Sequence, residues 1–434
     1  MKILHTADWH LGDTFHGFDR QEEHRHFLEW LSQTIGEQQP DALLLSGDIF
    51  DNPNPPAAAE RLFYDFLCRV SEGENAPQIV LTAGNHDSSS RLEAPAALFE
   101  RLGIEVRGTV PRDKDRNPDY RRLLIPITAK NRAEDKVVVM AVPFLRPDDY
   151  GEGETVSQGM RRFIENLRKK AVDLYGDGVP LVLMAHFYAV GSEISAAEHS
   201  ERLVVGGQDC VDCSGIGKGI AYAALGHIHK AQGVGRQENV RYAGSVLPMS
   251  FAERNYKHGV NLVTIEQDRV SVERLPYEPL RSLLSIPEDG SANYEEVLKL
   301  LSGLPKAGKA EENDDWPYLE VKVNEIHPDP AMANGITTKV EGRKARLCRI
   351  VRVRPTGDLA GDTAPTATAA DLRRLNPALL ARTIYKNVYN EDMPDEIARL
   401  FAQAKRRAEA ERQGLEQGQP EEPTNSVKDE NRQD

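Results

Sequence analysis

Histidine, aspartate and asparagine side chains gather in five short stretches of this 434-residue sequence. The stretches are Asp8-Trp9-His10, Gly47-Asp48-Ile49-Phe50-Asp51, Gly84-Asn85-His86-Asp87, Ala185-His186 and Gly226-His227-Ile228-His229. Carboxylate, amide and imidazole groups are the ligands that hard and borderline divalent metals prefer. A single histidine is more often a core or surface residue than a ligand, but the recurrence of histidine beside Asp or Asn indicates a metal site.

Each of the five stretches follows a short apolar run of the kind that forms a buried strand. The runs cover residues 3–4, 42–45, 79–81, 181–184 and 221–225. Because loops that leave the carboxyl ends of strands in an α/β sheet meet at one crevice, we expect the stretches to converge. Two cations about 3.5–4 Å apart could activate water there and neutralise phosphoryl charge, which is the chemistry of phosphoester hydrolysis. Asp48, after the most apolar run, is the candidate for a carboxylate that bridges them.

The composition is that of a globular protein, with 40% hydrophobic and 28% charged residues. We find neither a secretory signal pattern nor an apolar stretch near the ~20 residues that span a bilayer, so we expect a cytoplasmic protein without a membrane anchor. The net charge of −14 argues against a surface that binds nucleic acid everywhere, but it allows local contacts with DNA. Cys210 and Cys213 are expected to be two reduced thiols, because no second pair accompanies them.

Residues 1–280 alternate strand-like and helical patterns, which predicts an α/β domain. Its apolar spacing predicts helices over 57–71 and 88–102 and a closing hairpin over 259–275. Asp87 is expected to cap the second of these helices.

The pattern changes after residue 280, where a small α/β domain is expected over 281–355. Its predicted elements are a helix at 294–301 and strands at 319–323 and 346–353. The domain is followed by a predicted linker rich in Gly, Ala, Thr and Pro, a segment of two helix candidates and a disordered tail. These cover residues 356–370, 371–412 and 413–434.

The motif series resembles that of the calcineurin-like metallophosphoesterases: Asp-x-His, Gly-Asp-x-x-Asp, Gly-Asn-His-Asp, a later His and Gly-His-x-His. Residues 5–12 (HTADWHLG), 142–147 (VPFLRP) and 244–251 (GSVLPMSF) are similar, more narrowly, to the SbcD family of nuclease subunits. The resemblance implies a metallophosphoesterase fold, a layered β-sandwich flanked by helices. A small α/β capping domain and a C-terminal helical hairpin would follow it.

The same resemblance implies which residues hold two divalent metal ions, usually manganese in this family. The ligands of one ion would be Asp8, His10 and His229, those of the other Asn85, His186 and His227, with Asp48 between them. His86 would stay free of metal and stabilise the transition state or protonate the leaving oxygen. The carboxylate of Asp51 would orient His86.

A run of arginines in an otherwise acidic chain offers candidate DNA contacts. Arg346, Arg349 and Arg352 lie in it, and Arg146 is a further candidate. The run could follow the phosphate backbone, or it could be the solvated face of an ordinary strand.

The resemblance implies a manganese-dependent DNA nuclease, an exonuclease on duplex ends and an endonuclease on single strands and hairpins, that serves DNA repair, recombination and replication. Since the sequence contains no P-loop, ATP would be bound by a partner. The implied partner is an SbcC-type coiled-coil ATPase, docked on the helices at 371–412. The apolar stripe on 57–71 could be core, or half of a homodimer interface within a heterotetramer.

Two other functions remain possible. One is a stand-alone metallophosphodiesterase that acts on small-molecule or nucleotide phosphoesters, which would not need the region after residue 280. The other is a non-catalytic scaffold, which predicts eroded ligands, whereas here every motif residue is present.

Overall fold

The computed structural model describes most of the chain up to residue 353. The described residues are 1–73, 75–150, 155–190, 192, 211–212, 216–266, 269–308, 315–324, 330–353, 393–394 and 397–400. Cys210, Cys213, the linker at 356–370 and the tail at 413–434 lie outside them, as does most of the helical segment at 371–412. Within the described part of the chain, no helix is long and apolar enough to cross a membrane. The predicted domain boundaries and cellular location stay predictions.

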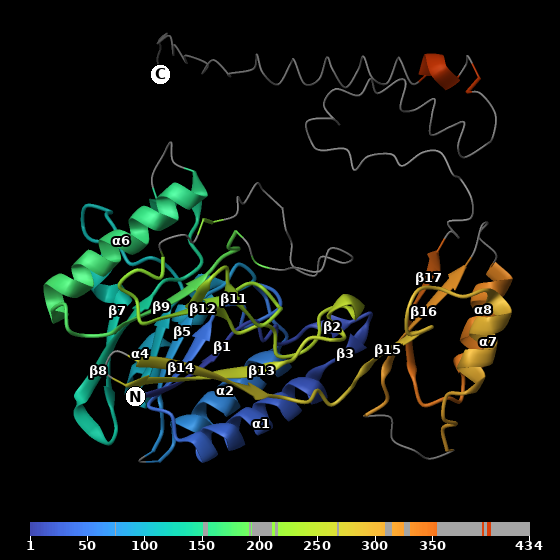
Figure 1. Cartoon of the computed structure of the whole chain (residues 1–434), viewed down its shortest axis with the longest axis horizontal. Coiled ribbons are helices and arrows are strands. Elements are labelled where there is room, and N and C mark those ends of the chain that lie inside the picture. Colours follow the sequence, from blue (N-terminus) through green and yellow to red (C-terminus); the bar gives the residue numbers. More distant parts are fainter. Residues whose placement is uncertain are drawn as a thin grey trace, which may run out of the picture. The chain divides into compact units, whose positions relative to one another are not determined.

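Two six-stranded sheets stacked face to face form the centre of the fold (Figure 1). The first has the order β14 (Arg269–Pro276), β13 (Gly259–Glu266), β1 (Lys2–Thr6), β4 (Ala42–Ser46), β5 (Gln78–Thr82), β6 (Ile104–Arg107). The second has the order β11 (Gln232–Val234), β12 (Gln237–Tyr242), β10 (Tyr222–Gly226), β9 (Leu181–His186), β8 (Arg132–Ala141), β7 (Leu124–Ala129). Side chains such as Leu44, Val80, Val182 and Ala224 are buried between the sheets. The predicted layered β-sandwich and its closing hairpin, β13–β14, are confirmed.

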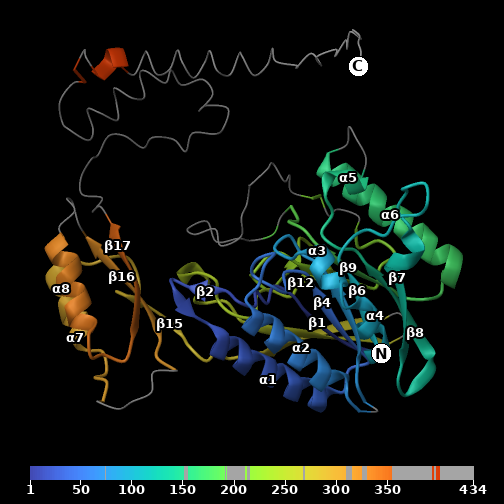
Figure 2. The same cartoon turned by 180° about the vertical axis from the view of Figure 1, so that it is seen from behind.

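Helices cover both outer faces of this sandwich (Figures 1 and 2). Helices α1 (Gln21–Gln38) and α2 (Ala57–Ser71) pack on the first sheet, and α6 (Val156–Tyr175) packs on the second. Helix α2 confirms the helix predicted over 57–71. Four of the five apolar residues of its stripe are buried in the core of this same chain, Phe63, Phe66, Leu67 and Val70, and the fifth, Leu62, packs against that core partly buried. Of the two readings of the stripe, core is therefore correct.

The single helix predicted over 88–102 is wrong. The segment forms α3 (Ser89–Glu93), α4 (Ala96–Phe99) and a 3-10 turn, η1 (Glu100–Leu102). Pro95, directly before α4, has no N–H to continue the hydrogen bonding of α3, so the first helix ends and another begins.

Parallel strands bring the five motif stretches to one edge of the sandwich. Strands β1, β4 and β5 are parallel in the first sheet, and β9 and β10 in the second. The loops that follow them are bonded to one another: the Asp8 N–H donates to Gly47 O at 3.1 Å and the Trp9 N–H to Asp48 O at 2.9 Å. Trp9 is buried and makes edge-on contacts with Phe27 of α1 and Phe66 of α2. The helix layer thus anchors the loop that carries Asp8 and His10.

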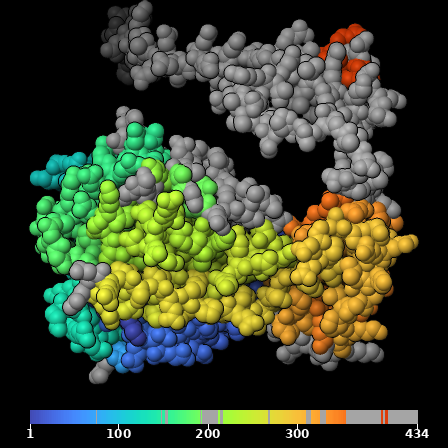
Figure 3. Space-filling model, viewed as in Figure 1, coloured from blue at the N-terminus to red at the C-terminus, as the bar shows by residue number. Residues whose placement is uncertain are grey.

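A smaller parallel sheet follows the sandwich, in the order β15 (Leu283–Ile286), β16 (Tyr318–Asn324), β17 (Arg346–Val353). Helices α7 (Tyr294–Ser302) and α8 (Pro330–Val340) pack on it around Val297, Leu319, Val321 and Ile336. The predicted strands and helix of this region are confirmed, and α8 was not predicted. Figure 3 shows the yellow segment of β13 and β14 running into this small sheet unit, in orange.

A buried ionic cluster joins the small sheet unit to the sandwich. Glu23 of α1 is fully buried, and its Oε2 accepts hydrogen bonds from Arg281 Nη1 at 3.1 Å and from the Tyr318 hydroxyl at 2.7 Å. Arg20 Nε donates to the same oxygen at 3.2 Å. Tyr318 also packs against Phe15, with ring centroids 4.8 Å apart. Charge and aromatic packing therefore hold the two parts together.

Candidate metal centre

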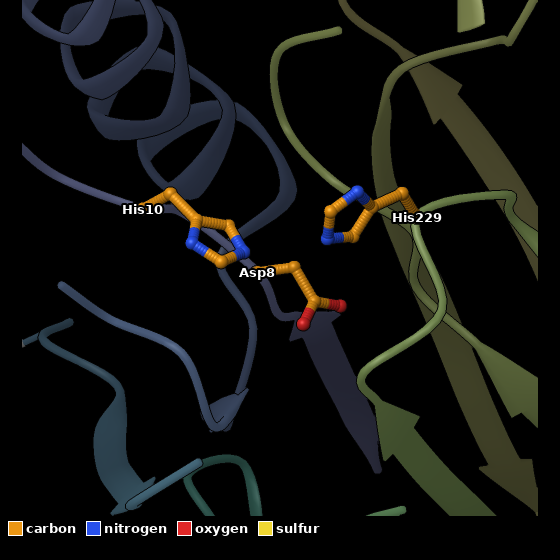
Figure 4. Close-up of side chains that lie close together, drawn as sticks. All are labelled: Asp8, His10 and His229. Atoms are coloured by element: carbon orange, nitrogen blue, oxygen red, sulfur yellow. The ribbon is translucent and has the colours of Figure 1, made fainter. Parts of the chain in front are cut away.

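The motif residues meet as three overlapping groups of possible metal ligands. In each group the ligand atoms lie within 4.8 Å of one another. The groups are Asp8, His10 and His229; His10, Asp48 and His86; and Asp48, His186 and His227. Figure 4 shows the first group, in which the three side chains turn toward one another from the loop after β1 and from the loop after β10.

Asp48 lies at the centre of this arrangement. Its Oδ2 is 3.1 Å from His186 Nε2 and 3.9 Å from His10 Nε2, so it faces a histidine of each outer group. Its Oδ1 accepts a hydrogen bond from the His86 N–H at 2.9 Å. One oxygen is thus held by the backbone, and the other points at the space that two cations would share.

Asn85, the remaining predicted ligand, lies with the second outer group. Its Oδ1 is 3.1 Å from His186 Nε2 and 3.0 Å from His227 Nδ1. The structure therefore brings together all seven residues that the sequence nominated as ligands.

Hydrogen bonds at the back of the rings select the nitrogen that each histidine can offer. His186 Nδ1 lies 2.9 Å from Ser46 O, a carbonyl that can only accept, so Nδ1 carries a proton and Nε2 is the nitrogen that can bind a cation. His229 Nδ1 is held in the same way, by a hydrogen bond at 3.3 Å with the buried carboxylate of Glu253. His10 Nδ1 faces the Asp51 carboxylate at 3.5 Å, without a hydrogen bond. Such partners fix metal-ligating histidines and raise their basicity.

Unsatisfied buried atoms show that these residues fit a cation. Asp8 Oδ2 and His10 Nε2 are buried and have no hydrogen-bond partner among the described residues. The other oxygen of Asp8 accepts the His227 N–H at 2.9 Å. Leaving buried polar atoms unpaired costs about 1–3 kcal/mol each, and a divalent ion between them would remove that cost. The mixed oxygen and nitrogen donors suit a divalent transition metal.

Charge couples His186 to Asp48. Burial disfavours the charged form of both, but the nearby carboxylate raises the pKa of His186 to about 9. The histidines around it hold the pKa of Asp48 well below its usual range, against the effect of burial. Burial, together with the nearby His186, lowers the pKa of His227 to about 3. Since only a neutral imidazole binds a metal, an ion would take the place of the His186 proton.

Two glycines are required by the close approach of the loops. A Cβ on Gly47, whose φ is +84°, would collide with the imidazole of His186. A Cβ on Gly84 would collide with the carboxylate and the backbone N of Asp48. Any larger residue at either position would displace a candidate ligand.

The backbone at the site is strained. Asp8, His10, Asp48 and His227 have positive φ values of 54°, 47°, 51° and 100°. Such conformations are uncommon outside glycine and concentrate where function requires them. The parallel strands and the bonded loops hold these four residues in place.

The predicted role of the Asp51 carboxylate is corrected by the structure. His86 Nδ1 lies 2.6 Å from the backbone oxygen of Asp51, whereas the Asp51 carboxylate faces His10. Asp51 therefore orients His86 through its carbonyl group, because its side chain turns toward the neighbouring loop.

The predicted helix cap at Asp87 is also wrong. The Asp87 carboxylate accepts hydrogen bonds from the N–H groups of Gly84, Ile49 and Phe50, at 2.8, 3.2 and 2.9 Å. It is buried and joins the loop of Asp48 to the loop of Asn85. A carboxylate can accept hydrogen bonds from the backbone of a distant loop as well as from the first turn of the next helix. Here its donors are the backbone N–H groups of two loops.

A cleft of about 450 Å³ opens over the first outer group. Its lining includes His10, Asp51, Asn85, His86 and His229. His86 is only partly buried, so it can meet a substrate in this cleft.

The four arginines predicted to contact DNA divide into two kinds. Arg349 donates through Nε to the buried Glu320 at 2.7 Å, and its guanidinium lies 5.2 Å from the centre of the Phe251 ring. Its charge is already neutralised inside the chain, which corrects its assignment as a DNA contact. Arg346 lies over the Phe18 ring at 5.6 Å. Arg146 and Arg352 are exposed. The contacts of Arg146, Arg346 and Arg352 with DNA stay predictions.

The sequence analysis missed two groups that hold candidate ligands in place. They are the carboxylate of Glu253, which contacts His229 Nδ1, and the carbonyl of Ser46, which contacts His186 Nδ1. Backbone oxygens leave no signal in a sequence. Glu253 is a lone acid, 24 positions from its partner, without a spacing that would mark it.

Comparison with known proteins agrees with this geometry. Residues 1–231 match the family model described as calcineurin-like phosphoesterase, and residues 279–389 match one described as the type 5 capsule protein repressor C-terminal domain. The chain is similar to the SbcD subunit of the SbcCD nuclease of Rhodobacter capsulatus, with 34% identity over 88% of this chain and 93% of that protein.

The proteins of the same name from Escherichia coli K12 and Bacillus subtilis are 32% and 34% identical. They cover 63% and 61% of this chain, and 68% and 66% of their own lengths. Fold, metal-ligand geometry and sequence thus agree: the chain belongs to the calcineurin-like phosphoesterase family and, within it, to the SbcD subunits of SbcCD nucleases.

Proposed function

We propose that this chain is the nuclease subunit of an SbcCD-type complex and hydrolyses phosphodiester bonds of DNA with two divalent metal ions, manganese first among them. The observation that carries the proposal is the pair of outer ligand groups that meet at Asp48. Membership of the SbcD family supports DNA as the substrate.

The proposed ligand assignment follows the groups. Asp8, His10 and His229 would hold one ion, and Asn85, His186 and His227 the other, with Asp48 between them. When bound, the ions lower the pKa of a coordinated water and neutralise charge on the phosphoryl oxygens. The backbone and side-chain partners described above keep the ligand atoms turned inward, so little reorganisation is needed when the substrate arrives.

His86 is proposed to act on the substrate directly. Its Nδ1 donates to Asp51 O, which leaves Nε2 for the cleft. In the imidazolium form Nε2 carries a second proton, which it can give to the leaving oxygen. Arg146, Arg346 and Arg352 are proposed to contact the DNA backbone.

The partner is proposed to be an SbcC-type coiled-coil ATPase that binds the segment at 371–412, where the sequence predicts apolar helices and which mostly lies outside the described residues. A homodimer within a heterotetramer is proposed as the assembly.

The test is cleavage of end-labelled duplex and hairpin DNA in manganese, with and without a coiled-coil ATPase and ATP. His86→Asn is compared with His26→Asn, a change on the outer helix α1. The proposal requires cutting that His86→Asn abolishes, that His26→Asn keeps, and that partner and ATP increase. Intact DNA alongside hydrolysis of a chromogenic phosphodiester would instead favour a small-molecule phosphodiesterase.

A further inference from the structure

The loop that follows β12 connects the metal centre with the small sheet unit. One end is bonded to the centre: the Ser245 N–H donates to His229 O at 3.0 Å and the Val246 N–H to Asp8 O at 3.4 Å. The other end is the short 3-10 turn η3 (Phe251–Glu253), which carries two buried side chains that point to different partners. We call residues 245–253 the connecting loop.

Glu253 is the residue of the connecting loop that contacts the metal centre. Its side chain is 2% exposed, and Oε1 lies 3.3 Å from His229 Nδ1. Its Oε2 accepts the Met249 N–H at 2.9 Å, which closes the connecting loop on itself. The carboxylate therefore has one oxygen fixed by the backbone and the other placed behind a candidate ligand.

This contact determines what His229 can offer. A carboxylate at Nδ1 keeps a proton on that atom and leaves the lone pair of Nε2 for a cation. Carboxylates in this position orient the ring and strengthen it as a ligand, and their loss typically weakens metal binding about 10–100-fold.

Phe251 is the residue of the connecting loop that contacts the small sheet unit. It is 4% exposed, and it packs against Phe15 with ring centroids 5.3 Å apart. The Arg349 guanidinium lies 5.2 Å from its centre, and the buried Glu320 of β16 holds that arginine. Phe251 is thus held from the small sheet unit by the residue that the sequence had suggested for DNA.

We propose that Glu253 is a positioning residue for His229, and that the small sheet unit keeps it in position through Phe251 and Arg349. The connecting loop is short, hydrogen-bonded to the metal centre at one end and packed against Arg349 at the other, so a shift of Arg349 moves Phe251 and, two residues on, Glu253. The proposal rests on the metal centre proposed above, and it adds a route by which the small sheet unit affects one ion and not the other.

The test is calorimetric titration of the full chain with Mn²⁺, which reports metal affinity without any need for catalysis. Glu253→Gln keeps the shape but supplies only one acceptor oxygen for two donors. It should weaken one of two Mn²⁺ sites about 10–100-fold and leave the other unchanged. The matched control is Glu266→Gln, at an exposed position at the end of β13, and it should bind as the wild type does.

The connection through the loop is tested in the same titration by Phe251→Leu. It should weaken the same site roughly 2- to 30-fold, the range for residues that couple two parts of a protein. Phe99→Leu, a buried change on α4, is the control and should have no effect. Circular dichroism and thermal unfolding in chelator establish that each variant is folded.

Wild-type affinity at both sites in Glu253→Gln would overturn the positioning role, and wild-type affinity in Phe251→Leu would overturn the connection. A wild-type chain that binds no Mn²⁺ would instead count against the proposed function.

If Glu253→Gln does not fold, nitrogen NMR of ¹⁵N-histidine-labelled wild type decides. At a pH where the rings are neutral, His229 should carry its proton on Nδ1, and a proton on Nε2 would overturn the proposal.

Discussion

Replacement of Glu23 by alanine should destabilise the chain more than any other single change to a charged residue of α1. The change leaves Arg281, 2% exposed, without the carboxylate at 3.1 Å that neutralises it, and it removes the acceptor of the Tyr318 hydroxyl. Breaking a buried ion pair by removing one partner costs about 3–5 kcal/mol. Arg20 keeps Asp13 at 3.1 Å, so we expect the lower end, about 3 kcal/mol.

The assay is urea unfolding followed by tryptophan fluorescence, in chelator so that metal binding does not contribute. Glu22→Ala is the matched control, because Glu22 pairs with Arg25 on the same helix but both side chains are about half exposed. Exposed pairs contribute at most about 1 kcal/mol. Arg281→Met added to Glu23→Ala should recover part of the loss, since it removes the unpaired charge. A loss below about 1 kcal/mol for Glu23→Ala would refute the view that this cluster holds the small sheet unit to the sandwich.

Four further predictions concern the site and the chain as a whole. His86→Asn should retain two bound metals, measured by elemental analysis, while hydrolysis collapses; loss of metal would show that His86 is a ligand. Asp48→Ala should lose both metals, because it removes the carboxylate proposed to lie between the two outer ligand groups, and normal metal content would exclude Asp48 as the bridge. Truncation after residue 355 should keep hydrolysis of a chromogenic phosphodiester but abolish stimulation of DNA cutting by partner and ATP; unchanged stimulation would place the partner elsewhere. Unfolding in chelator should become easier between pH 6.5 and 4, because burial lowers the pKa of His5 to about 3 and of His258 to about 4. Both rings are neutral in the folded chain, and below pH 6.5 they take up a proton when the chain unfolds. The free energy of unfolding should therefore fall by about 1.4 kcal/mol per pH unit for each ring. A free energy of unfolding that does not change over this pH range would contradict the prediction.

The sheets and the ligand groups could be anticipated because both depend on local sequence. Short apolar runs such as 42–45 and 181–184 are typical of buried strands, and a polar residue directly after such a strand lies at the strand end. Parallel pairing within each sheet, together with the stacking of the two sheets, then brings Asp48 and His186 to one edge, although they are far apart in the chain.

The contacts behind the ligands could not be anticipated, because they depend on how distant loops meet. The Asp87 carboxylate does not cap α3, because it accepts hydrogen bonds from three N–H groups of two loops instead. Asp51 orients His86 through a carbonyl, which every residue possesses and no motif marks. Arg349 looks like a DNA contact in a basic run, but Glu320 and Phe251, both remote in sequence, surround it.

The most direct test of the two-metal centre is anomalous diffraction from crystals of the full chain soaked in Mn²⁺. The account predicts two anomalous peaks about 3.5–4 Å apart, one against Asp8, His10 and His229, the other against Asn85, His186 and His227, with Asp48 touching both. A single peak, or two peaks without Asp48 between them, would contradict it.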